Sequence, residues 1–243
     1  MEALKTIPVI DGNIKNTDER PFIAGLVRLA FHDCVDEDEA NENFPDAKWN
    51  LNAVEDFFEN DGFVFDPADV VAILGAHSLG RAHTSNSGYE GKWLNGFRFR
   101  NPNVAHSDVL DNFYYRQINN DGWNQIQLAD DGNFQWQQND IEQPVAPLDA
   151  EGFPLNPTRR RDPRQVNMFL NVDMALRWDL GTPNSQNGEV ACSTTSTPPT
   201  CPDSPRFNLF DRYRRNNGNF INAFEIAFEK MVESKETETL LEA

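Results

Sequence analysis

The chain has 243 residues, of which 39% are hydrophobic and 11% aromatic, and its net charge at pH 7 is −18. This composition argues against disorder and favours one large domain or two packed lobes with a sizeable core. The charge disfavours nucleic acid and anionic membranes as partners and would attract cationic ones, although solubility alone explains it more simply. No apolar run approaches the roughly 20 residues needed to cross a bilayer, and residues 1–8 lack the apolar core of a signal peptide.

Two segments near the start of the chain predict helices. Residues 18–34 begin with Asp18 and Pro21, which suit a helix start, and continue without interruption to Cys34. After an acidic linker, residues 50–60 place apolar side chains at helical spacing. These side chains are Leu51, Val54, Phe57 and Phe58.

Residues 66–80 carry the clearest helix punctuation in the chain. Asp66 can cap the helix and Pro67 suits its first turn. Asp69 lies where an acidic residue stabilises the helix dipole, and Gly80 can end the helix.

The rest of the chain alternates between ordered segments and long loops. A further helix is expected at 108–118, and the polar stretch 119–163 predicts irregular structure with a small hairpin. Residues 165–179 form a compact ordered segment, whereas 181–205 form a loop. The last helix, 219–233, has one apolar stripe, and the whole pattern predicts a mostly α fold with little β structure. That stripe consists of Phe220, Phe224, Phe228 and Met231.

The three cysteines suggest one disulfide. Cys192 and Cys201 bracket a Ser/Thr/Pro-rich stretch that has no helix or strand to fix it, so a disulfide there would stabilise the loop. A disulfide favours an oxidising compartment, and extracellular secretion is the expectation. The alternative is two unpaired thiols in a cytosolic or organellar protein. Cys34 has no evident partner.

Arg28 and His32 form an unusual pair on the first predicted helix. Their i, i+4 spacing puts both on one face, close to small residues and to Phe31. A core-facing helix would place aliphatic residues there, so the face has room for a flat ligand beside the pair. A partly exposed polar stripe explains the same pattern equally well.

His77 lies on the apolar stripe of the predicted helix 66–80. A lone histidine in such a position is more often a hydrogen-bonded core residue than a ligand. However, Gly75 and Ala76 precede it and would let a large ligand approach closely. A metal-bound histidine also needs a partner for its other ring nitrogen. Asp173, in an apolar stretch where an unpaired charge would be costly, is the candidate.

These segments resemble the motifs of one enzyme family. Residues 26–34 resemble the distal-helix motif of the plant, fungal and bacterial haem peroxidases, and residues 70–81 resemble their proximal histidine motif. Residues 86–93 are similar to the segment that follows in the cytochrome c peroxidase and ascorbate peroxidase branch. Four motifs in the same order make the resemblance specific. It continues in residues 113–115, 121–123, 169–178 and 220–231.

The resemblance implies a single haem-peroxidase domain over residues 1–243, with two lobes around a haem cleft. Its distal part would span about 1–43 and its proximal part about 44–243. It also implies haem b as cofactor, and an enzyme that reduces hydrogen peroxide and oxidises small phenolic or protein donors. A basic electron-donor protein would suit the acidic surface. Some relatives bind a structural calcium or potassium ion at positions that match Asp33 or Ser78.

Site roles follow from the matched positions. The resemblance makes His77 the axial ligand of the haem iron and Asp173 the acceptor for its other ring nitrogen. It makes His32 the acid–base group for hydrogen peroxide and Arg28 the charge that stabilises the leaving oxygen. Trp93 matches the tryptophan that holds an oxidising equivalent in cytochrome c peroxidases. The haem contacts implied are Phe31, Leu74 and Ser78.

Two departures from the family pattern bear on activity. His77 follows His32 by only 45 positions, and the helices that relatives place in this interval are missing between Cys34 and Asn43. The missing block includes the asparagine that orients the distal histidine, so the alternative function is a peroxidase-fold binding or structural protein with reduced or lost haem chemistry. Asn86 stands where ascorbate peroxidases have an arginine, which disfavours ascorbate as donor.

Overall fold

The structure is a computed structural model, and parts of the predicted distal helix lie outside the residues it describes. The described residues are 27, 45–60, 63–83, 87–94, 97–98, 101–120, 122–129, 132–138, 167–196 and 199–233, with backbone alone for 97–98 and 101–104. Val27 is helical and buried. The remainder of the predicted helix 18–34 falls outside these ranges.

Helix α3 (Leu51–Asn60) matches the predicted helix 50–60 closely. Its buried side chains are the four apolar residues at helical spacing that predicted it. Phe57 and Phe58 pack with Phe63 and Phe65, and the rings of Phe58 and Phe65 are stacked at a centroid distance of 5.1 Å. This aromatic cluster anchors α3 to the start of the next helix.

Helix α4 (Pro67–Ile73) begins with a complete capping box. The Asp66 carboxylate accepts hydrogen bonds from the Ala68 and Asp69 amides, and the Asp69 carboxylate accepts one from the Asp66 amide. The predicted helix 66–80 therefore starts where the sequence indicated. It does not stay α-helical to its end, because residues Leu74–Ser78 tighten into a 3₁₀ helix, η1.

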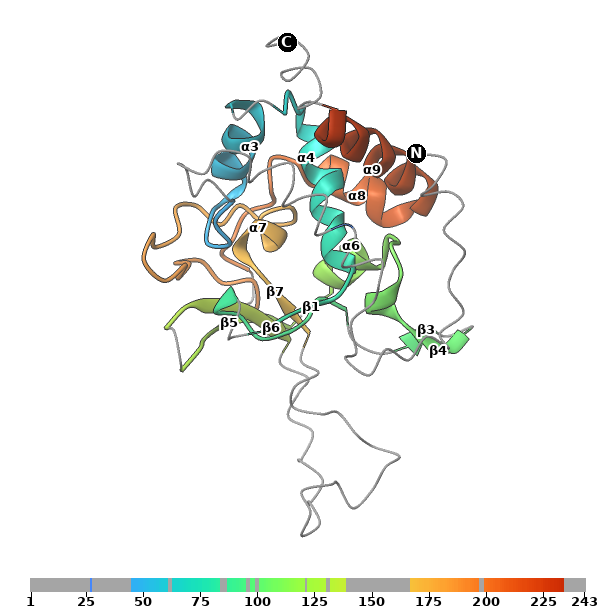
Figure 1. Ribbon diagram of the computed structural model, residues 1–243. Helices are drawn as coiled ribbons and strands as arrows, with labels where there is room; N and C mark the ends of the chain where they lie inside the picture. Colours follow the sequence, from blue (N-terminus) through green and yellow to red (C-terminus); the bar gives the residue numbers. More distant parts are fainter. Residues whose placement is uncertain are drawn as a thin grey trace.

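Helices α6 (Phe113–Ile118), α8 (Phe207–Arg215) and α9 (Asn217–Glu233) pack around α4 and η1. Figure 1 places α4 between α3 on one side and the α8–α9 pair on the other. The predicted stripe of α9 is confirmed as buried. Helix α6 is shorter than the predicted 108–118, since the chain first forms a 3₁₀ turn, η2 (His106–Asp108). Helix α8 was not predicted.

Gly75 is required by this packing. A Cβ atom at Gly75 would lie 2.7 Å from Cζ of Phe220 and 2.8 Å from the hydroxyl oxygen of Tyr115. The absence of a side chain therefore lets η1 lie directly against α9 and α6.

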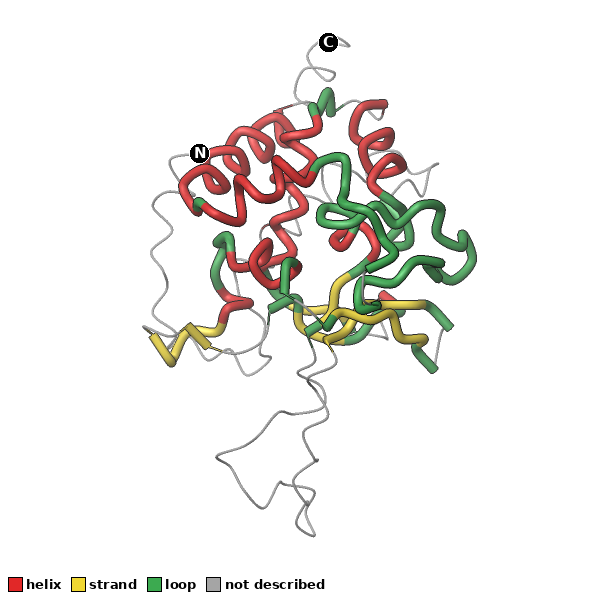
Figure 2. The backbone as a smooth tube through the Cα atoms, turned by 180° about the vertical axis from the view of Figure 1, so that it is seen from behind, coloured by secondary structure: helices red, strands yellow, loops and turns green. Residues whose placement is uncertain are grey.

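In the described part of the chain, three small antiparallel sheets lie on the side of the fold away from helices α8 and α9 (Figure 2). Strands β5 (Trp123–Gln127) and β6 (Phe134–Gln138) form the predicted hairpin, and β7 (Met168–Phe169) adds a third strand beside β6. The other two sheets are two-stranded. They pair β1 (Arg81–Ala82) with β2 (Gly91–Lys92), and β3 (Phe97–Arg98) with β4 (Asn101–Ala105).

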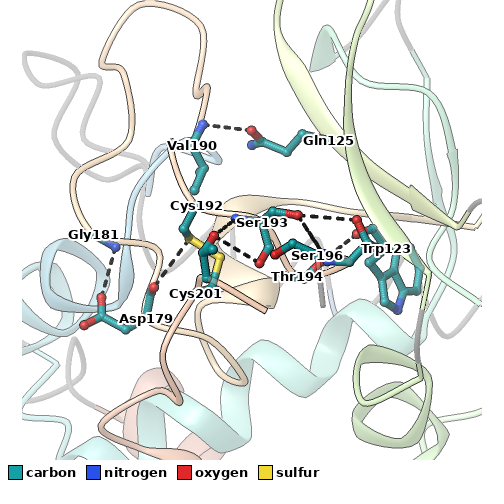
Figure 3. The surroundings of a disulfide bond; sticks show 12 residues. Trp123, Gln125, Asp179, Gly181, Val190, Cys192, Ser193, Thr194, Ser196 and Cys201 are labelled. Carbon is teal, nitrogen blue, oxygen red and sulfur yellow. Dashed lines mark hydrogen bonds between the residues drawn. A yellow bond between two sulfur atoms is a disulfide. The ribbon is translucent and has the colours of Figure 1, made fainter. Parts of the chain in front are cut away.

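The fold is mostly helical, as predicted, and the described part of residues 181–205 (181–196 and 199–205) forms the expected loop. Cys192 and Cys201 are joined by a disulfide with an S–S distance of 2.02 Å (Figure 3). The loop is fixed to β5, because the Thr194 hydroxyl donates to the Trp123 carbonyl at 2.6 Å and the Val190 amide donates to the Gln125 side chain at 2.8 Å. None of the described helices is both long and apolar enough to span a membrane.

Candidate haem site

His77 and Asp173, which the sequence paired, lie within hydrogen-bond distance. His77 belongs to η1, and Asp173 to the short helix α7 (Asn171–Met174) that follows β7. The His77 Nδ1 atom lies 2.7 Å from Oδ1 of Asp173. The Asp173 side chain is fully buried, whereas that of His77 is 31% exposed. No described residue forms a hydrogen bond with the other ring nitrogen of His77, Nε2, so that nitrogen is available to a ligand.

The Asp173 carboxylate is held by two further donors. Its Oδ2 atom accepts the Leu170 amide at 2.8 Å, and its Oδ1 atom accepts the Tyr114 hydroxyl at 2.6 Å. Burial raises the pKa of Tyr114 well above its usual value, and the nearby negative charge of Asp173 adds a smaller contribution in the same direction. This hydroxyl therefore remains a proton donor. Tyr114 was not among the predicted site residues.

Trp93 lies against the same histidine. The His77 and Trp93 rings are stacked with centroids 4.0 Å apart and planes only 4° from parallel. Trp93 is buried and follows directly after β2. The structure therefore brings together three of the predicted site residues, His77, Asp173 and Trp93, from three separate parts of the chain.

Asn171 fixes the helix that carries Asp173. Its amide nitrogen donates to the carbonyls of Lys48 and Gly188, at 3.0 and 2.9 Å. Its amide oxygen accepts from Trp136 and Gln125, at 2.9 and 3.0 Å. All four bonds of a buried asparagine are thus satisfied, and they tie the start of α7 to four other segments.

Leu74 and Ser78 bound the turn that carries His77. Both are buried, and the Ser78 hydroxyl donates to the Gly75 carbonyl at 2.9 Å. In the described part of the chain Ser78 therefore supports η1 from within. The remaining predicted site residues, Arg28, Phe31 and His32, lie outside the described residues, as do Asp33, Cys34 and Asn86.

The donor set suits an iron whose other ligands come from a porphyrin. Within the described ranges, no group of three or more His, Cys, Asp or Glu side chains could hold a bare metal ion. A single imidazole with its Nδ1 atom on a buried carboxylate is instead the arrangement found for metal-bound histidines in proteins. The residues present therefore fit haem, whose iron His77 would hold through Nε2.

Comparisons with known proteins agree with this chemistry. A family model described as Peroxidase matches residues 35–184, which is more than half of the chain and includes His77, Trp93 and Asp173. The match begins after Arg28 and His32.

Individual relatives cover shorter segments. A mitochondrial cytochrome c peroxidase of Candida glabrata is 33% identical over 96 residues, which are 40% of this chain and 23% of that protein. The mitochondrial cytochrome c peroxidase of Candida albicans is 36% identical over 94 residues, or 39% of this chain and 24% of that protein. A mitochondrial cytochrome c peroxidase of Yarrowia lipolytica is 32% identical over 93 residues, which are 37% of this chain and 24% of that protein. The chain thus matches about a quarter of the length of these relatives. It belongs to the peroxidase family, within the haem peroxidases that resemble cytochrome c peroxidase.

Proposed function

We propose that this protein is a haem-dependent peroxidase that reduces hydrogen peroxide and oxidises small phenolic or protein electron donors. The observation that carries the proposal is the His77 side chain, which is partly exposed and has Nδ1 on a buried carboxylate and Nε2 unoccupied by any described residue. A histidine that served only the core would be expected to bury both nitrogens with partners.

His77 would hold the haem b iron through Nε2, and Leu74, Ser78 and Phe31 would belong to the surroundings of the cofactor. When bound, haem supplies an iron centre that accepts electrons from a donor and passes them to hydrogen peroxide. Asp173 keeps the histidine proton on Nδ1 and draws it toward the carboxylate, which makes His77 a more electron-rich ligand.

His32 and Arg28 act on the peroxide itself. His32 would take a proton from one oxygen of hydrogen peroxide and return it to the other, so that this second oxygen can leave as water when bound haem supplies the electrons that break the O–O bond. Arg28 stabilises the negative charge that develops on the departing oxygen. Their roles are carried over from the family motif in residues 26–34.

Trp93 would carry electrons from the donor toward the haem that His77 would hold. Its stacking on His77 at 4.0 Å supports this role, because the two π-systems are in direct contact. The net charge of −18 favours a basic protein donor among the macromolecular candidates, while small phenols remain the other class. A structural calcium or potassium ion near Asp33 or Ser78 is part of the proposal through the family resemblance alone.

The whole chain, 1–243, acts as one domain in this proposal, with its distal part at about 1–43 and its proximal part at about 44–243. The Cys192–Cys201 disulfide favours an oxidising compartment, and secretion is the simplest such location. The relatives named mitochondrial make an organelle the competing location. Alkylation of free thiols in intact cells, followed by mass spectrometry, would show whether Cys192 and Cys201 are joined in a disulfide or free.

The test is the reaction of the haem-loaded full chain with hydrogen peroxide in a stopped-flow spectrometer. A Soret band that shifts on mixing and returns when a phenol is added would support a peroxidase. His32→Leu should slow the shift by about 10²–10⁴-fold while leaving haem bound. A protein that binds haem but does not react would instead favour the alternative, a peroxidase-fold binding or structural protein.

A further inference from the structure

A single oxygen atom carries two of the hydrogen bonds at the centre of the site. Oδ1 of Asp173 accepts from His77 Nδ1 at 2.7 Å and from the Tyr114 hydroxyl at 2.6 Å. The other carboxylate oxygen, Oδ2, is engaged by the Leu170 amide. His77 and Tyr114 therefore compete for the negative charge of one atom, and a stronger bond to either donor weakens the bond to the other.

The position of the Tyr114 hydroxyl is specific. Tyr115, its neighbour in α6, is equally buried, yet its hydroxyl donates to the main-chain carbonyl of Val71 at 2.7 Å. Burial alone therefore does not require a tyrosine hydroxyl in this core to reach a carboxylate. Trp93, which also lies beside His77, forms no hydrogen bond with Asp173 in the described structure.

We infer that Tyr114 is a positioning residue that limits how strongly Asp173 attracts the Nδ1 proton of His77. The inference rests on the proposed function only in taking His77 as the iron ligand. A weaker attraction leaves His77 a less electron-rich ligand, and a less electron-rich ligand raises the reduction potential of a bound iron. Tyr114 would thereby adjust, through Asp173, how electron-rich His77 is as a ligand.

The first test needs no haem. In the proton NMR spectrum of the full chain, the Nδ1 proton of His77 should give a downfield resonance that disappears in His77→Gln. Tyr114→Phe removes only the competing hydroxyl, so the resonance should move further downfield. Tyr115→Phe is the matched control, because it removes an equally buried hydroxyl that does not touch Asp173, and should leave the resonance in place.

A second variant keeps the test decisive if Tyr114→Phe does not fold. Site-specific incorporation of 3-fluorotyrosine at position 114 makes the phenol a stronger donor with almost no change of shape, so the His77 resonance should move upfield. A resonance that stays in place in either Tyr114 variant, or that moves equally in Tyr115→Phe, would overturn the inference.

The haem-loaded protein provides a separate readout. Tyr114→Phe should shift the iron(III)/iron(II) midpoint potential to more negative values, and Tyr115→Phe should not. Failure of every variant to bind haem would contradict the proposed function while leaving the NMR result on Tyr114 intact. Haem binding with an unshifted potential in Tyr114→Phe would contradict the inference and not the proposed function.

Discussion

Nδ1 of His77 lies 2.7 Å from Oδ1 of Asp173, although the two residues are 96 positions apart in the sequence. One belongs to a 3₁₀ turn that continues α4, and the other to a one-turn helix that follows the small sheet. The site therefore depends on how accurately the fold places η1 against α7. Changes at either element should alter ligand binding even where they do not touch a ligand.

Asp173→Asn should weaken haem binding about 10- to 100-fold, which is the usual cost of losing the carboxylate behind a metal-bound histidine. The amide keeps the shape of the side chain but removes the charge that holds the Nδ1 proton. Haemin titration followed at the Soret band measures the affinity. Asp203→Asn, which breaks the exposed pair with Arg177, is the control and should leave the affinity unchanged. Equal affinities for wild type and Asp173→Asn would exclude this role of the carboxylate.

Asn171→Asp should lower the free energy of unfolding, because the new oxygen would face the carbonyls of Lys48 and Gly188 in place of a donor. The Lys48 carbonyl would lose its donor at a cost of about 1–3 kcal/mol, whereas the Gly188 carbonyl still accepts from Gln125 Nε2. Urea unfolding measures the loss. Asn184→Asp is the matched control, since Asn184 is exposed and uses only its side-chain oxygen, which the substitution retains. A loss equal to that of the control would show that the Asn171 bonds are not stabilising.

The disulfide should contribute measurably to stability. Cys192 and Cys201 are nine positions apart, and closing so short a loop stabilises the folded state by about 2–3 kcal/mol in the chain-entropy model. The double variant Cys192→Ser, Cys201→Ser should lose this amount in urea unfolding without reductant. Reductant should then destabilise the wild type but not the variant. A loss of stability in the double variant on adding reductant would show that reductant does not act through the Cys192–Cys201 disulfide.

The ionisation of Asp211 should make the free energy of unfolding depend on pH in the acidic range. Burial alone would raise the pKa of this carboxyl, but hydrogen bonds and charge from Arg214 and Arg215 outweigh burial and hold the pKa below its usual value. A lowered folded-state pKa stabilises the protein above the unfolded pKa of about 4, and the gain is lost as pH falls through the folded value.

Asp211→Asn should therefore cost at most about 1 kcal/mol at pH 7, and less than that at pH 3. Urea unfolding at the two pH values gives both differences. Asp56→Asn on α3 is the control, as Asp56 is exposed and forms no ion pair with a described residue. A loss of unfolding free energy in Asp211→Asn that was larger at pH 3 than at pH 7 would contradict this prediction.

Features that depend on local sequence were the ones that could be predicted. Helices α3 and α9 were predicted from apolar residues at helical spacing, and the start of α4 from its capping residues. The disulfide was predicted because the Ser/Thr/Pro-rich stretch between its cysteines has no helix or strand to fix it. His77 and Asp173 could be paired because a buried charge requires a partner.

Features that depend on tertiary contacts were missed. Helix α8 is short and mostly polar, and only its Phe210 and Tyr213 side chains are buried. The hairpin of β5 and β6 was expected within residues 119–163, but its bounds were not, because both strands are rich in glutamine and do not alternate clearly between polar and apolar residues. Tyr114 bonds to a residue 59 positions away, and nothing in its own segment distinguishes it from Tyr115.

The central claim is that His77, held by Asp173, binds haem iron. Its most direct test is a haemin titration of the full chain beside His77→Ala and His83→Ala, with the Soret band as the signal. We predict saturable binding by the wild type and by His83→Ala, and loss of haem retention in His77→Ala. Equal retention by His77→Ala and the wild type, or no saturable Soret band in any of the three proteins, would contradict the account.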